Sequence, residues 1–314
     1  MSIENSSSSP AEFFHRSVLL KQCVEGLHIV DGGLYVDATL GGGGHSLAIL
    51  NAAKDVHIIG IDRDPHAIQA AKTRLQDFSH QCTYLSGTFL DCLSQITSPV
   101  HGILFDLGVS SPQLDHAHRG FSFASDGPLD MRMNPLSGSS AADLINTYSE
   151  KDLANIIYRY GEEPRSRRIA KAICAQRPFY RTLRFAECVR IASGYHKSKN
   201  HPATRTFQAI RIAVNNELAQ LQDALPKALS LLKPHGRLAV ISFHSLEDRI
   251  VKQFFQKVTG KITPKDAYGN PIHPPQAVPV CYKGMTGKEF DSSNPRARSA
   301  RLRIISKSPT SSHA

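Results

Sequence analysis

Four consecutive glycines at residues 41–44 constrain this chain more than any other feature of its sequence. They follow the apolar run Leu34–Asp37 and precede the helix-forming run at residues 45–50. Residues without a Cβ atom adopt positive φ angles readily, and they let backbone N–H groups approach a ligand at the positive end of the following helix. The pattern predicts a strand, a ligand-binding loop and a helix, in that order.

A second apolar run, residues 57–61, ends in Asp62. An acid at the tip of the second strand, about twenty residues after a glycine loop, accepts hydrogen bonds from a ribose diol. NAD, FAD and S-adenosylmethionine all use this arrangement. Ser46 stands where a dinucleotide fingerprint has its third glycine, whereas Asp37, Gly41 and Gly43 fit the S-adenosylmethionine pattern, in which Thr39 replaces the first glycine. The sequence favours S-adenosylmethionine and leaves a nicotinamide cofactor as the alternative.

Strand and helix patterns alternate over the first hundred residues and return near residues 237–242 and 300–305. Such alternation predicts an α/β fold with a doubly wound, mostly parallel sheet. Between the two parts the pattern becomes helical, which predicts an inserted all-helical domain. We expect the sheet domain to comprise residues 1–123 and 216–314, and the inserted substrate-recognition domain to comprise residues 124–215.

Three finer predictions concern segment boundaries. The spacing of Phe207, Ile210, Val214, Leu218 and Leu221 predicts one helix that opens at Pro202, followed by a separate helix over residues 225–232. Residues 260–293 are rich in Gly and Pro and predict a surface loop. Residues 1–12 are serine-rich and predict a short disordered leader.

The formal net charge of +10 is concentrated in one part of the chain. Residues 150–211 contain fourteen Lys or Arg against five acids, and a second cluster comprises Arg296, Arg298, Arg301 and Arg303. Segregated positive charge is typical of a surface that binds a polyanion. Phe179, Tyr180, Phe185 and Tyr195 lie among the arginines of the first segment and offer rings for base stacking, although core packing is the commoner role of such residues.

The remaining composition narrows the compartment. No apolar run approaches the length of about 20 residues that a membrane-spanning helix needs, and no secretion signal precedes the fold. The six cysteines show no CxxC or Cys/His spacing, so we expect no structural metal and no disulfides. These features predict a cytoplasmic protein without a membrane partner.

The fourth predicted strand ends at Asp106 and leads into Ser110, Ser111 and Pro112. Doubly wound folds bind substrate at this edge of the sheet. Enzymes that methylate exocyclic amines resemble one another in an acid, Asn or Ser followed by prolines and an aromatic residue at this place. Ser111-Pro112 matches only the first half of that motif. A rigid turn of this kind presents acceptors to the two protons of an amine and aims its lone pair at a methyl donor.

Taken together, the motifs of this chain resemble those of the bacterial small-subunit ribosomal RNA cytosine-N4 methyltransferases, the RsmH/MraW family. The resemblance covers most of the chain. It rests on the segments at residues 15–20, 37–46, 62–65, 106–115, 119–123, 129–135, 160–163, 201–211, 242–249 and 294–299.

The resemblance implies methylation of N4 of a cytosine in the decoding region of 16S rRNA, with S-adenosylmethionine as the methyl donor bound in a Rossmann-like methyltransferase fold. It implies that the small ribosomal subunit, or a late assembly intermediate, is the partner. The cofactor contacts implied by the motifs are Gly43, Gly44, His45, Asp62, Phe89, Asp106 and Gln113. The residues expected to orient the amine or contact the substrate are Ser111, Ser110 and His244. No general base is named, and a homodimer is left open.

Two other functional classes remain at this stage. The first is a nicotinamide-dependent oxidoreductase, and the second is a non-catalytic RNA-binding or ribosome-assembly factor that binds S-adenosylmethionine. Both accommodate the glycine loop, and the second also accommodates the basic segment.

Overall fold

The structure is a computed structural model that describes residues 16–194, 201–262, 264, 266–269, 272, 274–281 and 283–309. The predicted leader at residues 1–12 lies outside the described residues. So do Tyr195, Lys197 and Lys199 of the basic segment.

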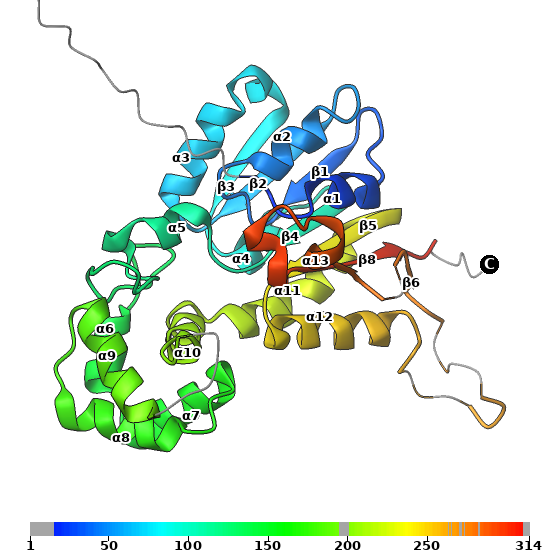
Figure 1. The fold of residues 1–314 in the computed structure, drawn as a ribbon. Helices are drawn as coiled ribbons and strands as arrows, with labels where there is room; N and C mark the ends of the chain where they lie inside the picture. Colours follow the sequence, from blue (N-terminus) through cyan, green and yellow to red (C-terminus); the bar gives the residue numbers. More distant parts are fainter. Residues whose placement is uncertain are drawn as a thin grey trace, which may run out of the picture.

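An eight-stranded sheet forms the centre of the molecule (Figure 1). Its order is β3-β2-β1-β4-β5-β8-β6, with β7 also paired to β8; β1 to β5 are parallel, and β8 runs antiparallel to its neighbours. The predicted mostly parallel, doubly wound sheet is confirmed. The strands are β1 (Leu34–Asp37), β2 (His57–Asp62), β3 (Cys82–Ser86), β4 (Val100–Asp106), β5 (Leu232–Ser242), β6 (Ala277–Pro279), β7 (Met285–Thr286) and β8 (Arg301–Lys307).

Helices cover both faces of the sheet because successive side chains of each buried strand point to opposite faces. Ile103 and Phe105 of β4 pack in one apolar cluster with residues of α4, α11 and α12, whereas Leu104 packs in another with residues of α1, α2 and α3. The helices of the first face are α4 (Phe89–Gln95), α11 (Glu217–Leu231) and α12 (Ser245–Val258). Those of the second are α1 (Leu20–Leu27), α2 (Gly44–Leu50) and α3 (Pro65–Arg74), which the short η1 (Gln76–Gln81) follows.

The start of α3 shows how local sequence fixes an element. Asp64 is the N-cap, and its Oδ1 accepts a hydrogen bond from the backbone N–H of His66 at 3.0 Å. Pro65 occupies the first helical position, where the missing N–H costs nothing. The pair Asp64-Pro65 therefore determines where this helix begins.

A group of helices lies to one side of the sheet, at the lower left of Figure 1. It has an apolar core of its own, in which Ile157, Phe179, Phe185 and Phe207 are buried. The helices are α6 (Ala141–Thr147), α7 (Glu150–Gly161), α8 (Ser166–Gln176), α9 (Thr182–Ser193) and α10 (Thr204–Asn215). The short α5 (Ser111–Asp115) and η2 (Ala117–Arg119) lead into this group from β4. That residues 124–215 form a separate domain stays a prediction.

The helix predicted from Pro202 to Leu221 is wrong in its end point. The helix α10 ends before Asn216, which adopts a left-handed conformation with φ of 50°. The next helix, α11, then runs through Pro226 without interruption. The side chain of the preceding Asn215 is held at 2.8 Å from both the carbonyl of Met131 and the N–H of Met133. These tertiary bonds fix the break, and the apolar spacing carries no trace of them.

The surface loop predicted over residues 260–293 is also wrong in part. It contains β6, β7 and α13 (Gly287–Phe290), and η3 (Pro295–Ser299) follows it. β6 and β7 both pair with β8, which supplies unpaired backbone groups to segments too short to form strands alone. Within the part of the chain that the structure describes, no helix combines the length and apolar character needed to cross a membrane.

Candidate active site

A cavity of about 670 Å³ lies where the chain leaves the neighbouring strands β1 and β4. In this strand order the connections after β1 and β4 run to opposite sides, which leaves a crevice at the carboxyl ends of the strands. The cavity is lined by the glycine loop, the ends of β2 and β4, the start of α4 and α5, and residues from both chain ends. The fold therefore brings together the two predicted parts of the site, the glycine loop and the segment that follows β4.

Asp37 anchors the glycine loop from below. Its carboxylate is buried and accepts hydrogen bonds from Ser46 Oγ at 2.7 Å and from the N–H of Thr39 at 3.3 Å. Burial raises the pKa of Asp37 to about 6, and the hydrogen bonds from Ser46 and Thr39 oppose that shift. Ser46, which replaces the third glycine of a dinucleotide fingerprint, thus ties α2 to the end of β1.

The four glycines have different roles. Gly41, Gly42 and Gly44 line the cavity, whereas Gly43 does not. Gly43 is the N-cap of α2 with φ of 75°, and a Cβ there would press on Ala71 and Leu75 at 3.3 Å. A Cβ on Gly44 would clash with Ser17 Oγ. Of the two predicted cofactor-contacting glycines, the structure brings Gly44 to the cavity and gives Gly43 a packing role.

Asp62 lies at the end of β2 and lines the cavity. One carboxylate oxygen accepts a hydrogen bond from the N–H of Gly41 and the other from the N–H of Asp64, both at 2.9 Å. Burial raises the pKa of Asp62 to about 6 despite these bonds. Each carboxylate oxygen retains a lone pair for a further donor. The geometry suits the predicted contact with a ribose diol.

His45 and Asp106 face each other across the cavity floor. His45 Nε2 lies 3.0 Å from the carbonyl oxygen of Val18, and Nδ1 lies 3.6 Å from Asp106 Oδ2. Burial raises the pKa of Asp106 to about 6, and His45 opposes the shift. Asp106 Oδ1 is buried and has no hydrogen-bond partner among the residues described. A buried acceptor without a donor is uncommon in native proteins, and it marks a place for a ligand N–H group.

Phe89 is the first residue of α4 and lines the cavity. Its ring packs edge-to-face against the buried Phe105, with the ring centroids 5.5 Å apart. Phe89 remains partly exposed. One edge of the ring therefore belongs to the core while the side chain still borders the space beside Asp62, as a contact to an adenine requires.

Ser110, Ser111 and Gln113 line the cavity from the segment that follows β4. Ser110 is the N-cap of α5, and its N–H donates to Gln113 Oε1 at 3.0 Å. Gln113 Nε2 donates to Asp64 Oδ2 at 3.1 Å, so both ends of this amide serve the protein. Ser111 Oγ is buried with no hydrogen-bond partner in the described chain. Of the three polar groups, the hydroxyl of Ser111 is the one left unsatisfied.

Asp64 connects these residues to the helical group. Arg119 Nη1 donates to Asp64 Oδ2 at 2.6 Å, and Arg119 Nη2 donates to the carbonyl of Met133 at 2.9 Å. Both members of the ion pair are buried. Because an unpaired buried charge is costly, this pair fixes the residues after β4 relative to the segment that leads into α6.

Two predicted site residues, Gly43 and His244, do not line the cavity. His244 is the N-cap of α12, where its Nδ1 accepts from the N–H of Glu247 at 3.4 Å. Its Nε2 lies 3.1 Å from Glu247 Oε1, although without the angle of a hydrogen bond. The geometry gives His244 a structural role, and its contact with substrate stays a prediction.

The sequence analysis missed several residues of the cavity. Arg211, held by Glu217 through two hydrogen bonds of 2.8 and 2.9 Å, lines it from α10. Ser17, Pro295, Arg296 and Ser299 line it from the two ends of the chain. Ser17, Arg211, Pro295, Arg296 and Ser299 all lie in segments that carry the family resemblance, at residues 15–20, 201–211 and 294–299, which is the signal that the sequence offers for them. Nothing in the local sequence near Pro295 indicates that this turn folds back onto the glycine loop.

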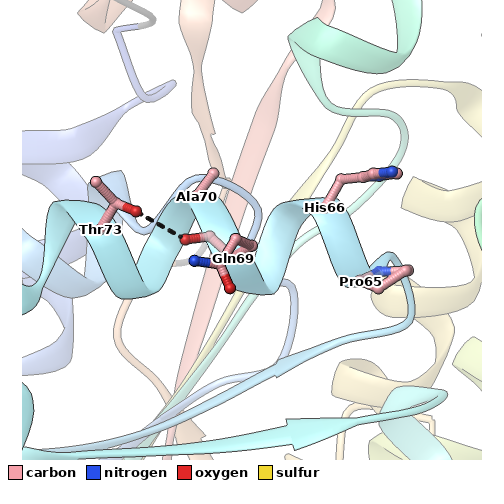
Figure 2. Close-up of a pocket in the computed structure, with 5 residues that line it drawn as sticks. All are labelled: Pro65, His66, Gln69, Ala70 and Thr73. Carbon is pink, nitrogen blue, oxygen red and sulfur yellow. Dashed lines mark hydrogen bonds between the residues drawn. The ribbon is translucent and has the colours of Figure 1, made fainter.

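A second depression lies on the outer side of α3, between Pro65, His66, Gln69, Ala70 and Thr73 (Figure 2). Four of these residues are exposed, and the one hydrogen bond among them runs from Thr73 Oγ1 to the carbonyl of Gln69 at 3.2 Å within the helix. All five belong to a single helix, and no buried polar group faces the depression. We therefore place the site at the glycine loop.

The aromatic residues of the basic segment divide between core and surface. Phe179 and Phe185 are buried and pack against each other, so they are unavailable for base stacking. Tyr180 is 63% exposed, and Tyr195 lies outside the described residues. On α8, Arg167, Arg168 and Lys171 are exposed and have no acidic partner within the described ranges. The charged surface predicted from the sequence is thus present on this helix.

Comparison with known proteins gives one consistent result. Residues 12–308 match the model of the MraW methylase family. Ribosomal RNA small subunit methyltransferase H of Synechococcus elongatus is 49% identical over 303 residues, which cover 95% of this chain and 96% of that protein. The proteins of the same name from Dehalococcoides mccartyi and Alcanivorax borkumensis are 48% and 45% identical; the matches cover 93% and 96% of this chain, and 86% and 99% of theirs.

Proposed function

The chain belongs to the MraW methylase family, and from this premise we propose that it methylates N4 of a cytosine in the decoding region of 16S rRNA. It is a methyltransferase, and its relatives act on small-subunit ribosomal RNA. S-adenosylmethionine is the methyl donor. A nicotinamide-dependent oxidoreductase is therefore no longer a candidate.

The residues of the cavity fit this donor. Gly44 and the start of α2 would allow a close backbone approach, Asp62 would accept hydrogen bonds from the ribose, and Phe89 would border the adenine. Asp106 carries the unpartnered Oδ1, which suits the ammonium group at the methionine end. When bound, S-adenosylmethionine supplies an electrophilic methyl group on a positively charged sulfur. We assign Gly43 and Gln113 a supporting role, because Gly43 packs behind the loop and Gln113 is engaged by Ser110 and Asp64.

One observation supports an exocyclic amine as the methyl acceptor: the hydroxyl of Ser111 is buried and unpartnered within the described chain. The lone pair of a cytosine amine is delocalised into the ring, so the nitrogen is a weak nucleophile until acceptors hold its protons out of the ring plane. Ser111 Oγ is an unpartnered hydroxyl in a cavity that the glycine loop also lines. Such a group accepts a hydrogen bond from an N–H of the amine without giving up an existing bond, and this contact directs the lone pair towards the methyl group.

The transfer does not need a dedicated base. Once the methyl group is attached, the nitrogen is positively charged and far more acidic than neutral cytosine, so water removes the proton. We name no residue for this step. Positioning and the exclusion of competing geometries are the tasks of Ser111 and the neighbouring loop.

The substrate must be an unpaired or flipped cytosine, because an amine engaged in a base pair cannot present its lone pair. The exposed cations of α8 are suited to hold flanking phosphates in the small subunit or a late assembly intermediate. A non-catalytic assembly factor also fits this surface. It does not explain why a buried hydroxyl is left unsatisfied in the same cavity as the glycine loop.

Transfer of a radiolabelled methyl group onto assembled small subunits, naked rRNA and DNA tests the proposal. We expect label in the small-subunit RNA, and nucleoside mass spectrometry should identify N4-methylcytidine. If S-adenosylmethionine binds while none of the three substrates is labelled, the enzyme is not a nucleic-acid methyltransferase and the assembly factor is favoured. Label on the cytosine ring carbon or on another base would refute the N4 assignment.

A further inference from the structure

The basic cluster at the carboxyl end of the chain is divided by the structure into two pairs of arginines. Arg303 is largely buried and donates two hydrogen bonds to Asp248, at 2.7 and 3.0 Å. Arg301 lies 3.9 Å from the same carboxylate. Arg298 is exposed and has no partner in the described chain, and Arg296 pairs with Asp115 at the surface. Of the four, Arg296 and Arg298 are the two that belong to η3, the turn that contributes to the lining of the cavity.

These two arginines belong to η3, which forms one wall of the cavity. Pro295, Arg296 and Ser299 line the same space as the glycine loop and Ser111. The turn is held by Asp291, which is buried and accepts hydrogen bonds from the N–H of Leu19 at 3.0 Å and from Asn294 Nδ2 at 3.3 Å. The segments around Leu19 and Asp291 are thus joined beside the cavity, which holds the backbone of η3 in place before any ligand arrives.

The ion pair with Asp115 places Arg296 relative to Ser111. Asp115 is the last residue of α5, and Ser111 is the first. At a rise of about 1.5 Å per residue, the backbone positions of these two residues are about 6 Å apart along the helix. Arg296 Nη2 lies 2.9 Å from Asp115 Oδ2. The guanidinium therefore lies within roughly one nucleotide's reach of the hydroxyl that faces the acceptor amine.

We propose that Arg296 and Arg298 hold the backbone phosphates of the target nucleotide and its neighbour while Ser111 engages the base. This inference rests on the proposed RNA substrate. Arg296 exchanges Asp115 for a phosphate oxygen, which costs little because Asp115 is 57% exposed and the ion pair is screened by water. A planar guanidinium binds phosphate through two parallel hydrogen bonds, so this contact fixes the orientation of the nucleotide as well as its position.

Four single variants separate a phosphate contact from a structural role. R296Q and R298Q each remove one cation of the proposed contact. D115N removes the carboxylate that competes with phosphate for Arg296 but leaves the arginine. K54Q is the matched control, because Lys54 is exposed in the turn before β2, at the opposite edge of the sheet. The readouts are affinity for decoding-region RNA at several salt concentrations, affinity for S-adenosylmethionine by calorimetry, and methyl transfer to small subunits.

We expect R296Q and R298Q each to weaken RNA binding several-fold at low salt and to lower the slope of log affinity against log salt by about one. Affinity for S-adenosylmethionine should stay within twofold of wild type. D115N should bind RNA at least as tightly as wild type, and K54Q should match wild type.

Three results would overturn the inference. Wild-type salt slopes in R296Q and R298Q would mean that neither residue contacts a phosphate. A loss of RNA affinity in D115N equal to that in R296Q would mean that the ion pair acts only by holding α5. A parallel loss of cofactor affinity would assign the turn to the cofactor instead. A wild-type protein that labels no RNA would refute the proposed function itself, which is a different outcome.

Discussion

The hydroxyl of Ser111 is buried without a partner, whereas most buried polar groups in proteins are hydrogen-bonded. Removing a buried hydroxyl that has no partner relieves a desolvation cost, so S111A should be as stable as wild type or slightly more stable. Methyl transfer by S111A should fall by about 10²-fold, a magnitude typical of removing one positioned group at a reacting centre. Thermal unfolding and single-turnover transfer on saturated enzyme measure the two effects.

Ser46 provides the matched control at residue scale. Its hydroxyl donates to the buried carboxylate of Asp37 at 2.7 Å, so S46A leaves that group short of a donor. We expect S46A to lower the free energy of unfolding by about 1 to 3 kcal/mol. Full transfer activity in S111A, or a loss of stability in S111A as large as that in S46A, would contradict the proposed role of Ser111.

Burial raises the pKa values of three carboxyls at the site from 3.8 to about 6: those of Asp62 and Asp106, which line the cavity, and that of Asp37 beneath the glycine loop. A raised pKa means that the folded state holds the proton more tightly than the unfolded state, so the stabilisation is complete below about pH 4 and is lost as the pH rises through 6. D106N removes one such group. The stability of wild type relative to D106N should therefore fall between pH 4 and 7, by up to about 3 kcal/mol.

The same carboxyls predict the pH dependence of cofactor binding. S-adenosylmethionine carries positive charge on its sulfur and its ammonium group, so it favours the ionised form of Asp106. Affinity measured by calorimetry should rise as the pH increases from 5 to 7 and should then level off, with protons released on binding near pH 6. D106N should bind more weakly and with a flatter pH profile. An affinity that is constant across this range would contradict the assignment of Asp106 to the cofactor.

At the scale of elements, the break between α10 and α11 depends on one left-handed residue. Asn216 has φ of 50°, a conformation that Asn and Gly tolerate and β-branched residues do not. N216G should change the free energy of unfolding by less than about 0.5 kcal/mol, whereas N216V should lower it by about 1 to 2 kcal/mol. Chemical denaturation of both variants measures the difference. Equal stability of the two would show that the break does not depend on this conformation.

The sequence predicts elements well where the determinant is local. β1, β2 and β4 follow from buried apolar runs, and α3 follows from its Asp64-Pro65 cap. The break at Asn216 does not follow, because the bonds from Asn215 to Met131 and Met133 join residues more than eighty positions apart. The strands β6 and β7 are not predicted from the sequence for the same reason, since their backbone partners lie on β8.

The site residues also differ in whether their positions depend on local sequence or on contacts between distant parts of the chain. Gly44, Asp62, Asp106 and Ser111 lie at or just after the ends of predicted parallel strands. The carboxyl ends of such strands meet at one edge of the sheet, so the sequence places these residues together. Gly43 and Gly44 look alike in the sequence, yet one packs on α3 and the other lines the cavity. Arg296 reaches the cavity on a turn in which Asp291 accepts a hydrogen bond from the N–H of Leu19, a contact between distant parts of the chain.

At the scale of the whole molecule, the helical group is fixed to the sheet at several polar contacts. Glu162 accepts hydrogen bonds from Ser245 at 2.6 Å and from Arg249 at 2.9 Å, both at the start of α12. Arg63, which follows β2, donates to the carbonyl of Asn215 at 2.9 Å. These contacts connect the helical group to the carboxyl edge of the sheet, where the cavity lies. A polyanion bound by the group is thereby held near the site.

The exposed cations of α8 predict a salt dependence that belongs to the helical group alone. Arg167, Arg168 and Lys171 have no acidic partner in the described ranges, so each is available to displace a counterion from RNA. The triple variant R167Q/R168Q/K171Q should lower the slope of log RNA affinity against log salt by about 2 to 3, while S-adenosylmethionine affinity stays unchanged. K54Q again serves as the control. Because α8 is remote from Ser111, transfer at saturating RNA should persist in the triple variant, unlike in S111A. If the RNA affinity of the wild type does not change from low to high salt, neither α8 nor the turn at η3 contacts phosphates.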